Sequence, residues 1–281
     1  MKTDLKNIPC FGIAGNFTGH LEQAGEAAEF QNVKTKEKNA PKAIFPTYIP
    51  NAKNPAPEFL GVFPFDSGKI IFPHGEEKLQ IEPECALIFN AEWSDGKLKS
   101  LNPVKFAASN DCSIRKAGAK KISMKKNWGK SSKGISETLI SIDKFSEEGI
   151  LAKYRIACFL LREGEIFEYG EDSPVKGYSY IFEKLINWLI EKFNTQKDES
   201  TTENIGSYLA ATGLPEQIMF SIGATRYTKF GETNFLKDGD ESIVILYPEH
   251  KYTNAEIKEI AAGKYFAGKD TSVLRQKIIV Q

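Results

Sequence analysis

One stretch of the sequence, LQIEPECALIF at residues 79–89, passes from alternating polar and apolar residues into a continuous apolar run. Alternation is typical of a strand with one solvated face, and a continuous apolar run is typical of a strand that is buried on both faces. The pattern therefore predicts a strand over residues 79–89 that enters a hydrophobic core. Two acids, Glu82 and Glu84, lie where this strand becomes apolar.

The spacing of these two acids suggests a cation site. Residues two apart on a strand project from the same face, so the two carboxylates would stand side by side, about 6 to 7 Å apart at the backbone. Two acids aimed at one point repel each other unless a cation lies between them. A solvated strand face produces the same Glu-x-Glu pattern, but the apolar run directly after Glu84 favours a buried pair.

A third acid lies in the segment Asn110-Asp111-Cys112-Ser113-Ile114-Arg115, which follows small residues at 107–109. An acid at the end of a strand can complete an oxygen-rich cation site, while Arg115 pairs with a neighbouring carboxylate. An Asn-Asp turn with a surface arginine would have the same sequence. The chain has only three histidines, so any metal must be held mainly by oxygen, which favours Mg²⁺, Mn²⁺ or Ca²⁺.

Two glycine-containing segments are further candidates. The segment NFTGH at residues 16–20 ends in His20, which could act as a general base on a flexible loop or be an ordinary structural histidine. The basic segment MKKNWGKSSKG at residues 124–134 could bind a phosphate or a carboxylate, or be an exposed loop. Its spacing does not match a nucleotide P-loop.

The composition excludes several classes of protein. The 281 residues carry 37 basic and 37 acidic side chains, so no overall basic field favours nucleic acid or an anionic membrane. No apolar run approaches the roughly 20 residues that span a bilayer. The N-terminal residues lack the apolar stretch of a signal peptide, so a cytoplasmic protein is expected. The four cysteines are far apart and form no CxxC pair, and we expect Cys85 and Cys112 to be inert core residues.

The remaining patterns predict a β-rich α+β fold. Glycine and proline are dense over residues 9–75, where long helices are not expected. Predicted strands, besides residues 79–89, are 59–63, 69–72, 137–142, 154–161, 217–222 and 242–247. Predicted helices are 178–193, 202–212 and 254–262. We expect an N-terminal strand and loop region at 1–75 that carries His20, and a core at 76–281, in one continuous domain.

The order of the motifs along the chain resembles that of the fumarylacetoacetate hydrolase family. The family opens with C-x-G-x-N-Y-x-x-H, has a P-x-x-F segment, and later combines E-x-E with N-D-x-[ST]-x-R. The stretches that look like these motifs are CFGI at 10–13 with NFTGH at 16–20, PKAIF at 41–45, EPE at 82–84 and NDCSIR at 110–115. Near the C-terminus, GAT at 223–225 resembles the family's substrate loop, and FLKDGD at 235–240 resembles its closing turn.

This resemblance implies a mixed β-sheet roll with a few peripheral helices, usually assembled as a homodimer. It implies one Mg²⁺, or Mn²⁺ or Ca²⁺, held by Glu82, Glu84 and Asp111, with a small oxo acid as the substrate. His20 and Lys130 are the implied catalytic residues, because Lys130 fits the family's loop better than Lys133. The implied substrate-binding residues are Thr225, Gly134 and Lys133.

The sequence departs from the family in one residue that bears on activity. Family members usually have a glutamate three residues after the histidine, and this chain has Gln23 there. A neutral amide cannot polarise the histidine, so Glu22 is the substitute if the catalytic pair is present. The function implied is metal-dependent hydrolysis of a carbon–carbon bond in a β-dicarbonyl or 2-oxo acid. Three alternatives stay open: a decarboxylase or tautomerase, a non-hydrolytic metal- and ligand-binding relative, and purely structural carboxylates.

Overall fold

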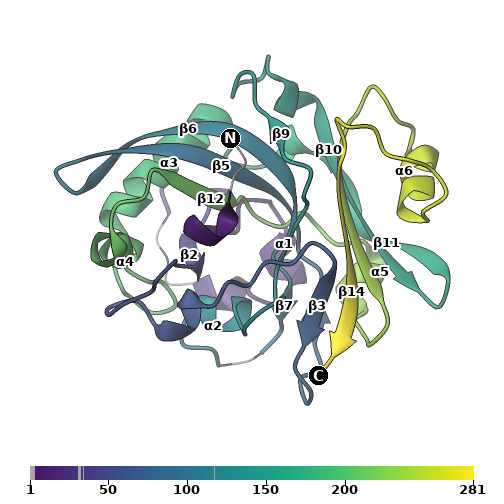
Figure 1. Cartoon of the computed structure of the whole chain (residues 1–281), viewed down its shortest axis with the longest axis horizontal. Coiled ribbons are helices and arrows are strands. Elements are labelled where there is room, and N and C mark those ends of the chain that lie inside the picture. The colour runs from purple at the N-terminus through teal and green to yellow at the C-terminus, as the bar shows by residue number, and fades with distance from the viewer. Residues whose placement is uncertain (1–3, 31–32, 34, 117) are drawn as a thin grey trace.

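Two β-sheets, each built from strands that are far apart in the sequence, form the body of the protein (Figure 1). The computed structural model describes residues 4–30, 33, 35–116 and 118–281. The strand-rich α+β architecture predicted from the sequence is confirmed. In the described part of the chain, no helix combines the length and apolarity needed to cross a membrane.

The elements have the following bounds. The strands are β1 (Cys10–Ala14), β2 (Ala43–Tyr48), β3 (Lys69–Phe72), β4 (Leu79–Gln80), β5 (Pro83–Ser94), β6 (Lys97–Asn110), β7 (Ser113–Ile114), β8 (Gly134–Ile135), β9 (Ile140–Ser141), β10 (Tyr154–Arg162), β11 (Glu165–Pro174), β12 (Gln217–Ser221), β13 (Glu241–Pro248) and β14 (Ser272–Val280). The α-helices are α1 (His20–Gln23), α2 (Ser123–Lys126), α3 (Phe182–Thr195), α4 (Ile205–Thr212), α5 (Lys229–Thr233) and α6 (Asn254–Ala261). The 3-10 helices are η1 (Leu5–Asn7), η2 (Ala27–Phe30), η3 (Glu58–Gly61), η4 (Ile150–Lys153) and η5 (Val175–Gly177).

The strand order shows how the N-terminal residues join the rest of the chain. The larger sheet has the order β2-β1-β12-β5-β6-β8, with β9 also paired to β6, and the smaller has the order β11-β10-β13-β14-β3. Both sheets are mixed, because β1 runs parallel to β12 and β14 runs parallel to β3. A separate two-stranded ladder joins β4 to β7. Strands from before residue 76 therefore complete both large sheets.

The main core lies between the two sheets, and the strands that reach it are buried on both faces. In β13, Val244 and Leu246 face this core, whereas Ile243 and Ile245 face a second apolar cluster on the outer side of the smaller sheet. Successive strand residues point to opposite faces, so burial on both sides requires a continuous apolar run. The same reason accounts for the apolar run in β5.

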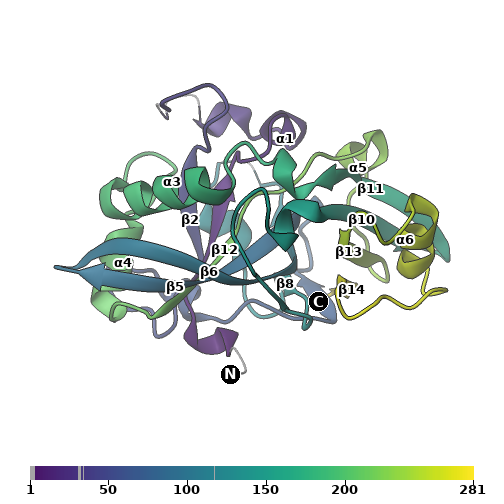
Figure 2. The ribbon, with the colours of Figure 1, turned by 90° about the horizontal axis from the view of Figure 1, so that it is seen from above.

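Two helices cover the sheets. Phe193 of α3 packs edge-on against Phe11 of β1 and Phe220 of β12, and α3 lies along the β5–β6 hairpin (Figure 2). Helix α6 packs Ile257 and Ile260 onto the outer face of the smaller sheet, on the side away from the larger sheet (Figure 1).

The structure also corrects several predicted elements. Residues 59–61 belong to the helix η3, and residues 62 and 63 lie in no strand. Only Ile140–Ser141 of the predicted strand 137–142 is extended in a ladder. The predicted strand 79–89 is broken at residues 81 and 82. The helix predicted from residue 178 begins at Phe182, because Ile181 has an extended backbone with φ −142° and ψ 165°.

Candidate functional site

The three acids singled out in the sequence converge at the start of the long β5–β6 hairpin. The break between β4 and β5 places Glu82 in the connection, Glu84 is the second residue of β5, and Asp111 directly follows β6. The Asp111 amide donates to the Glu82 carbonyl over 3.0 Å, and the Glu82 amide donates to Asn110 Oδ1 over 3.0 Å. One ligand oxygen from each acid lies within 4.8 Å of the others, and all three side chains are buried.

Glu82 and Glu84 differ in pKa because different charges surround them. Burial and the neighbouring charges of Asp111 and Glu82 raise the pKa of Glu84 well above its ordinary value. Burial also acts to raise the pKa of Glu82, but Lys126 and Arg115 outweigh it and hold that pKa well below its ordinary value. Of these two acids, Glu84 is therefore the one that needs an additional positive charge in order to ionise.

Buried cations surround the cluster. Lys126 Nζ lies 2.5 Å from Glu82 Oε2 and 2.7 Å from Asp111 Oδ2, so one ammonium joins the two acids. Lys133 Nζ lies 3.1 Å from Asp111 Oδ1 and donates to the Cys112 carbonyl. Glu82 Oε1 and Asp111 Oδ2 have no hydrogen-bond partner of correct geometry among the described residues, although a cation lies near each.

A fourth acid, Glu26, joins this site from the N-terminal region. Arg115 Nη1 lies 2.8 Å from Glu26 Oε1 and 2.8 Å from Glu82 Oε1, so the same nitrogen touches both acids. Lys125 Nζ also lies 2.8 Å from Glu26 Oε1. Burial alone would raise the pKa of Glu26, but Arg115, Lys126 and Lys125 lower it to about 2. Four buried acids are thus interleaved with four buried cations.

His20 begins helix α1 and lines a small cavity beside the acids. Its Nδ1 lies 2.9 Å from the Thr225 carbonyl. A carbonyl can only accept, so we assign the proton of the neutral ring to Nδ1, which leaves a lone pair on Nε2. Burial lowers the pKa of His20 below its ordinary value, more strongly than Glu82 raises it. His20 is therefore neutral near pH 7 and suited to take up a proton.

The cavity is small. His20, Glu26, Glu82, Glu84 and Lys126 contribute to its lining, and its volume is about 20 Å³. A space of this size holds about one water molecule or one ion. An oxo acid would fit only if α1 or its neighbours moved outward.

The Gln23 side chain makes its two hydrogen bonds with the backbone of Tyr227. Gln23 Nε2 donates to the Tyr227 carbonyl over 3.0 Å, and its Oε1 accepts from the Tyr227 amide over 2.9 Å. Gln23 thus attaches α1 to the segment after β12. Glu22 is exposed, so the buried acid that this region brings to the site is Glu26.

The structure brings together some of the other predicted residues and not others. Lys133 contacts the acidic cluster, whereas Lys130 is exposed. Thr225 is buried beside His20, and within the described residues its Oγ1 has no hydrogen-bond partner. Gly134 lies in β8, where an added Cβ would come within 2.3 Å of the Gln276 side chain. Gly134 therefore serves close packing at a distance from the His20 side of the cluster.

Sequence reasoning missed Lys126 and Glu26. Lys126 lies in the basic segment 124–134, but the sequence offered no reason to choose it over its neighbours. Its distinguishing feature is its place at the end of α2, which packs against β7 and so brings the lysine to Asp111. The expected pairing of Arg115 with a neighbouring carboxylate is confirmed.

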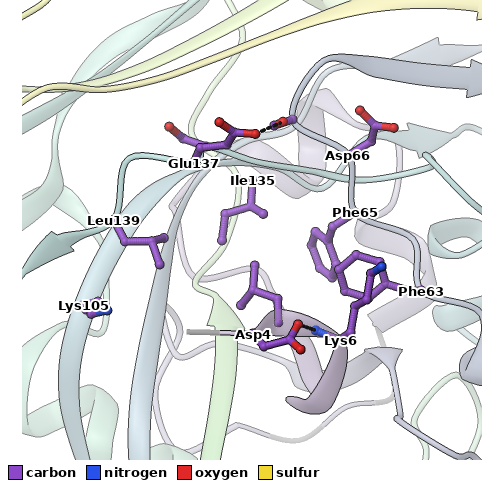
Figure 3. Close-up of a pocket in the computed structure, with 12 residues that line it drawn as sticks. Asp4, Lys6, Phe63, Phe65, Asp66, Lys105, Ile135, Glu137 and Leu139 are labelled. Carbon is purple, nitrogen blue, oxygen red and sulfur yellow. Dashed lines mark hydrogen bonds between the residues drawn. The ribbon is translucent and has the colours of Figure 1, made fainter. Parts of the chain in front are cut away.

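A much larger cavity than the one beside His20 lies elsewhere. It has a volume of about 610 Å³ and an apolar floor that includes Phe63, Phe65, Ile135 and Leu139, while Lys6 and Glu137 stand at its rim (Figure 3). It shares no lining residue with the small cavity beside His20. Size alone is a weak indicator of function. We place the candidate site at the convergent acids because, among the residues that the structure describes, they are the group that offers a set of metal ligands.

A family model matches residues 26–278 of the chain, and it is described as a family of unknown function, DUF5718. The chain belongs to the DUF5718 family. The match covers most of both sheets and all the acids described above, so the acidic cluster lies within the DUF5718 region. No curated protein matches the sequence.

Solved structures show the same fold at low sequence identity. A hexagonal crystal form of 2-keto-3-deoxyarabinonate dehydratase has a TM-score of 0.56 and 16% identity, covering 97% of this chain and 74% of that one. A second structure is 2-keto-3-deoxy-D-arabinonate dehydratase complexed with magnesium and 2,5-dioxopentanoate, with a TM-score of 0.55, 15% identity, and coverage of 98% and 74%. A third, 2-hydroxyhepta-2,4-diene-1,7-dioate isomerase from Mycobacterium marinum, has a TM-score of 0.53, 10% identity, and coverage of 97% and 75%.

These neighbours are members of the fumarylacetoacetate hydrolase superfamily. The DUF5718 chain therefore shares the fold that its ordered motifs predicted. At 10 to 16% identity, the similarity shows the fold alone.

Proposed function

We propose that this DUF5718 chain is a divalent-metal-dependent enzyme that acts on a small 2-oxo acid or β-dicarbonyl compound. The observation that carries the proposal is the convergence of three buried carboxylates beside a cavity that two of them, Glu82 and Glu84, line together with a neutral histidine. The magnesium and 2,5-dioxopentanoate named for one structural neighbour are consistent with this ligand chemistry.

The donor set suits a hard divalent ion. Glu82, Glu84 and Asp111 supply only oxygen, and Mg²⁺ and Mn²⁺ prefer such ligands. Burial, together with the neighbouring charges of Asp111 and Glu82, raises the pKa of Glu84, and a bound cation would act in the opposite direction. When bound there, an ion would supply Lewis acidity toward a substrate oxygen.

The residues of the chain have separate roles in this proposal. His20 would use Nε2 to remove or return a proton on the substrate, because Nδ1 is held by the Thr225 carbonyl. Lys126 and Lys133 would hold Glu82 and Asp111 in place and add positive charge next to a developing oxyanion. The Thr225 hydroxyl is buried and available to bind a substrate oxygen.

The site favours a decarboxylase or tautomerase over the hydrolase implied by the resemblance. An acid on Nδ1 would stabilise the imidazolium that forms when His20 takes a proton from water, and a backbone carbonyl occupies that position. Gln23 is engaged with Tyr227 and carries no charge. Proton transfer to or from a substrate carbon needs only the neutral imidazole. The expected homodimer and cytoplasmic location stay predictions.

A second candidate function is purely structural. Glu82 pairs with both Arg115 and Lys126, and an ion-pair network of this kind can hold a fold together without any metal. This candidate predicts no specific binding of a divalent ion.

Titration calorimetry with Mn²⁺ separates the two candidates. We expect the wild-type protein to bind one Mn²⁺ and Asp111→Asn to bind it at least tenfold more weakly, while Glu22→Gln, which changes an exposed acid, serves as the control and binds normally. Oxalate, which presents two adjacent oxygens as an enolised 2-oxo acid does, should then bind to the Mn²⁺-loaded protein alone. An absence of Mn²⁺ binding in the wild type, or equal affinity in Asp111→Asn, would refute the proposed function.

A further inference from the structure

The segment His20–Glu26 is attached to the rest of the protein at three points along its length. His20 contacts the Thr225 carbonyl, Gln23 makes two hydrogen bonds with Tyr227, and Glu26 pairs with Arg115 and Lys125. The first two attachments reach the segment after β12. The third reaches the acidic cluster itself.

The Glu26 attachment differs from the others because it consists of charges. A buried carboxylate that loses its partners is strongly destabilised, so charged groups fix a buried segment more firmly than neutral hydrogen bonds do. Gly25, with φ +70°, turns the chain after α1 so that Glu26 points back into the protein. Arg115 then joins Glu26 to Glu82, because one of its nitrogens lies 2.8 Å from both.

Arg115 is itself held rigidly. Its Nε donates to Gln80 Oε1 over 2.7 Å, and its Nη2 donates to the Tyr227 hydroxyl over 2.8 Å. The Tyr227 hydroxyl in turn donates to the Ile81 carbonyl over 2.8 Å. Because Arg115 is fixed in this way, its ion pair with Glu26 also fixes the position of the segment His20–Glu26.

We infer that Glu26 is a positioning residue whose ion pairs with Arg115 and Lys125 hold His20 closed over the acidic cluster. Glu26 is not one of the three acids that form the possible ligand set, and it acts through the place it gives to His20. The role of His20 rests on the proposed function, but the closed state of the segment does not. Release of Glu26 would let α1 swing outward and would enlarge the 20 Å³ cavity toward the size of an oxo acid.

Chemical modification of histidine measures this closed state directly. Diethyl pyrocarbonate acylates accessible neutral imidazole, and peptide mass spectrometry follows each histidine separately. His20 is buried, whereas His74 and His250 are exposed and serve as internal references in the same sample. We expect His20 to react at least tenfold more slowly than the two references in the metal-free wild type.

In Glu26→Gln, we expect His20 to react about tenfold faster than in the wild type, while His74 and His250 keep their rates. Glu22→Gln is the matched control on the same segment and should leave all three rates unchanged, and Glu26→Asp should restore part of the protection. An unchanged His20 rate in a folded Glu26→Gln protein would overturn the inference. If that variant does not fold, Lys125→Met takes its place: a faster His20 rate supports the inference, and an unchanged rate overturns it.

The outcome of this histidine-modification experiment is independent of the Mn²⁺-binding test of the proposed function. It uses no metal and no substrate, so loss of Mn²⁺ binding in Asp111→Asn has no bearing on it. A protein that binds Mn²⁺ but keeps His20 protected in Glu26→Gln would retain the proposed function and lose the positioning role of Glu26.

Discussion

The replacement Glu203→Gln tests how the helix that carries the site lysines is supported from behind. Glu203 is buried, and its Oε1 accepts a hydrogen bond of 2.8 Å from the hydroxyl of Ser123, the first residue of α2. Its Oε2 has no partner among the residues that the structure describes. Burial raises the pKa of Glu203 from 4.5 to about 7, although Ser123 and Lys121 act in the opposite direction.

The size of the Glu203 pKa shift sets the expected change in the free energy of unfolding. An acid whose pKa is raised in the folded state favours folding while it is protonated, and it loses that advantage as pH rises from 4.5 through about 7. At about 1.4 kcal/mol for each pH unit, ionised Glu203 costs roughly 3 kcal/mol above pH 7. Glutamine has the shape of the protonated acid and cannot ionise. Glu203→Gln should therefore match the wild type near pH 5 and exceed its free energy of unfolding by about 1 to 3 kcal/mol near pH 9.

Urea unfolding at pH 5, 7 and 9, followed by far-UV circular dichroism, measures this difference. Glu183→Gln, which changes an exposed acid on α3, is the control and should show no pH-dependent gain. A stability difference between Glu203→Gln and the wild type that is the same at all three pH values would refute the reasoning, because it would mean that Glu203 does not titrate in this range.

Two further predictions concern buried groups. All four cysteines are buried, and burial raises the pKa of each thiol. We therefore expect an aromatic disulfide reagent to label no cysteine in the native protein and all four in urea. Rapid labelling of any cysteine in the native state would contradict this packing. Lys126→Met removes the ammonium between Glu82 and Asp111 and should lower the free energy of unfolding by about 3 to 5 kcal/mol. Lys130→Met changes an exposed lysine and should lower it by less than about 0.5 kcal/mol. Urea unfolding without added metal measures both. Equal stability of the two lysine variants would show that the ammonium does not hold the acids together.

The sequence predicted the strands that are buried on both faces and missed those with a solvated face. Runs such as 242–247 are continuously apolar because both faces of β13 pack against apolar clusters. Strand β6, in contrast, mixes buried residues with exposed and half-buried ones over residues 97–105 and becomes continuously buried only from Phe106 onward. Its first half has the composition of a loop, so only pairing with β5 identifies it as a strand.

The acids of the site could be predicted for a different reason. Glu82, Glu84 and Asp111 lie at the ends of two strands that are neighbours in the sequence, so a local pattern almost fixes their meeting point. Glu26 and Lys126 meet the cluster through contacts across 89 and 44 residues, respectively, and no local pattern carries that information. Motif resemblance did not help either, because Gln23 occupies the position where the family has its acid.

The balance of charge at the site bears on which function it serves. Buried ion pairs often contribute less to stability than apolar side chains of the same size would, so a network of four acids and four cations is a poor way to build a core. In a purely structural network, each buried polar group should also have a hydrogen-bond or ion-pair partner. Here, however, the pKa of Glu84 is raised, and Thr225 Oγ1 has no hydrogen-bond partner within the described residues. A cavity also remains beside His20. These unsatisfied groups lie together on the His20 side, where a ligand would enter. A divalent ion bound there would add two positive charges and would make ionised Glu84 favourable. The resulting excess of positive charge would in turn suit a substrate with a carboxylate and a developing enolate, which is the class proposed for this chain.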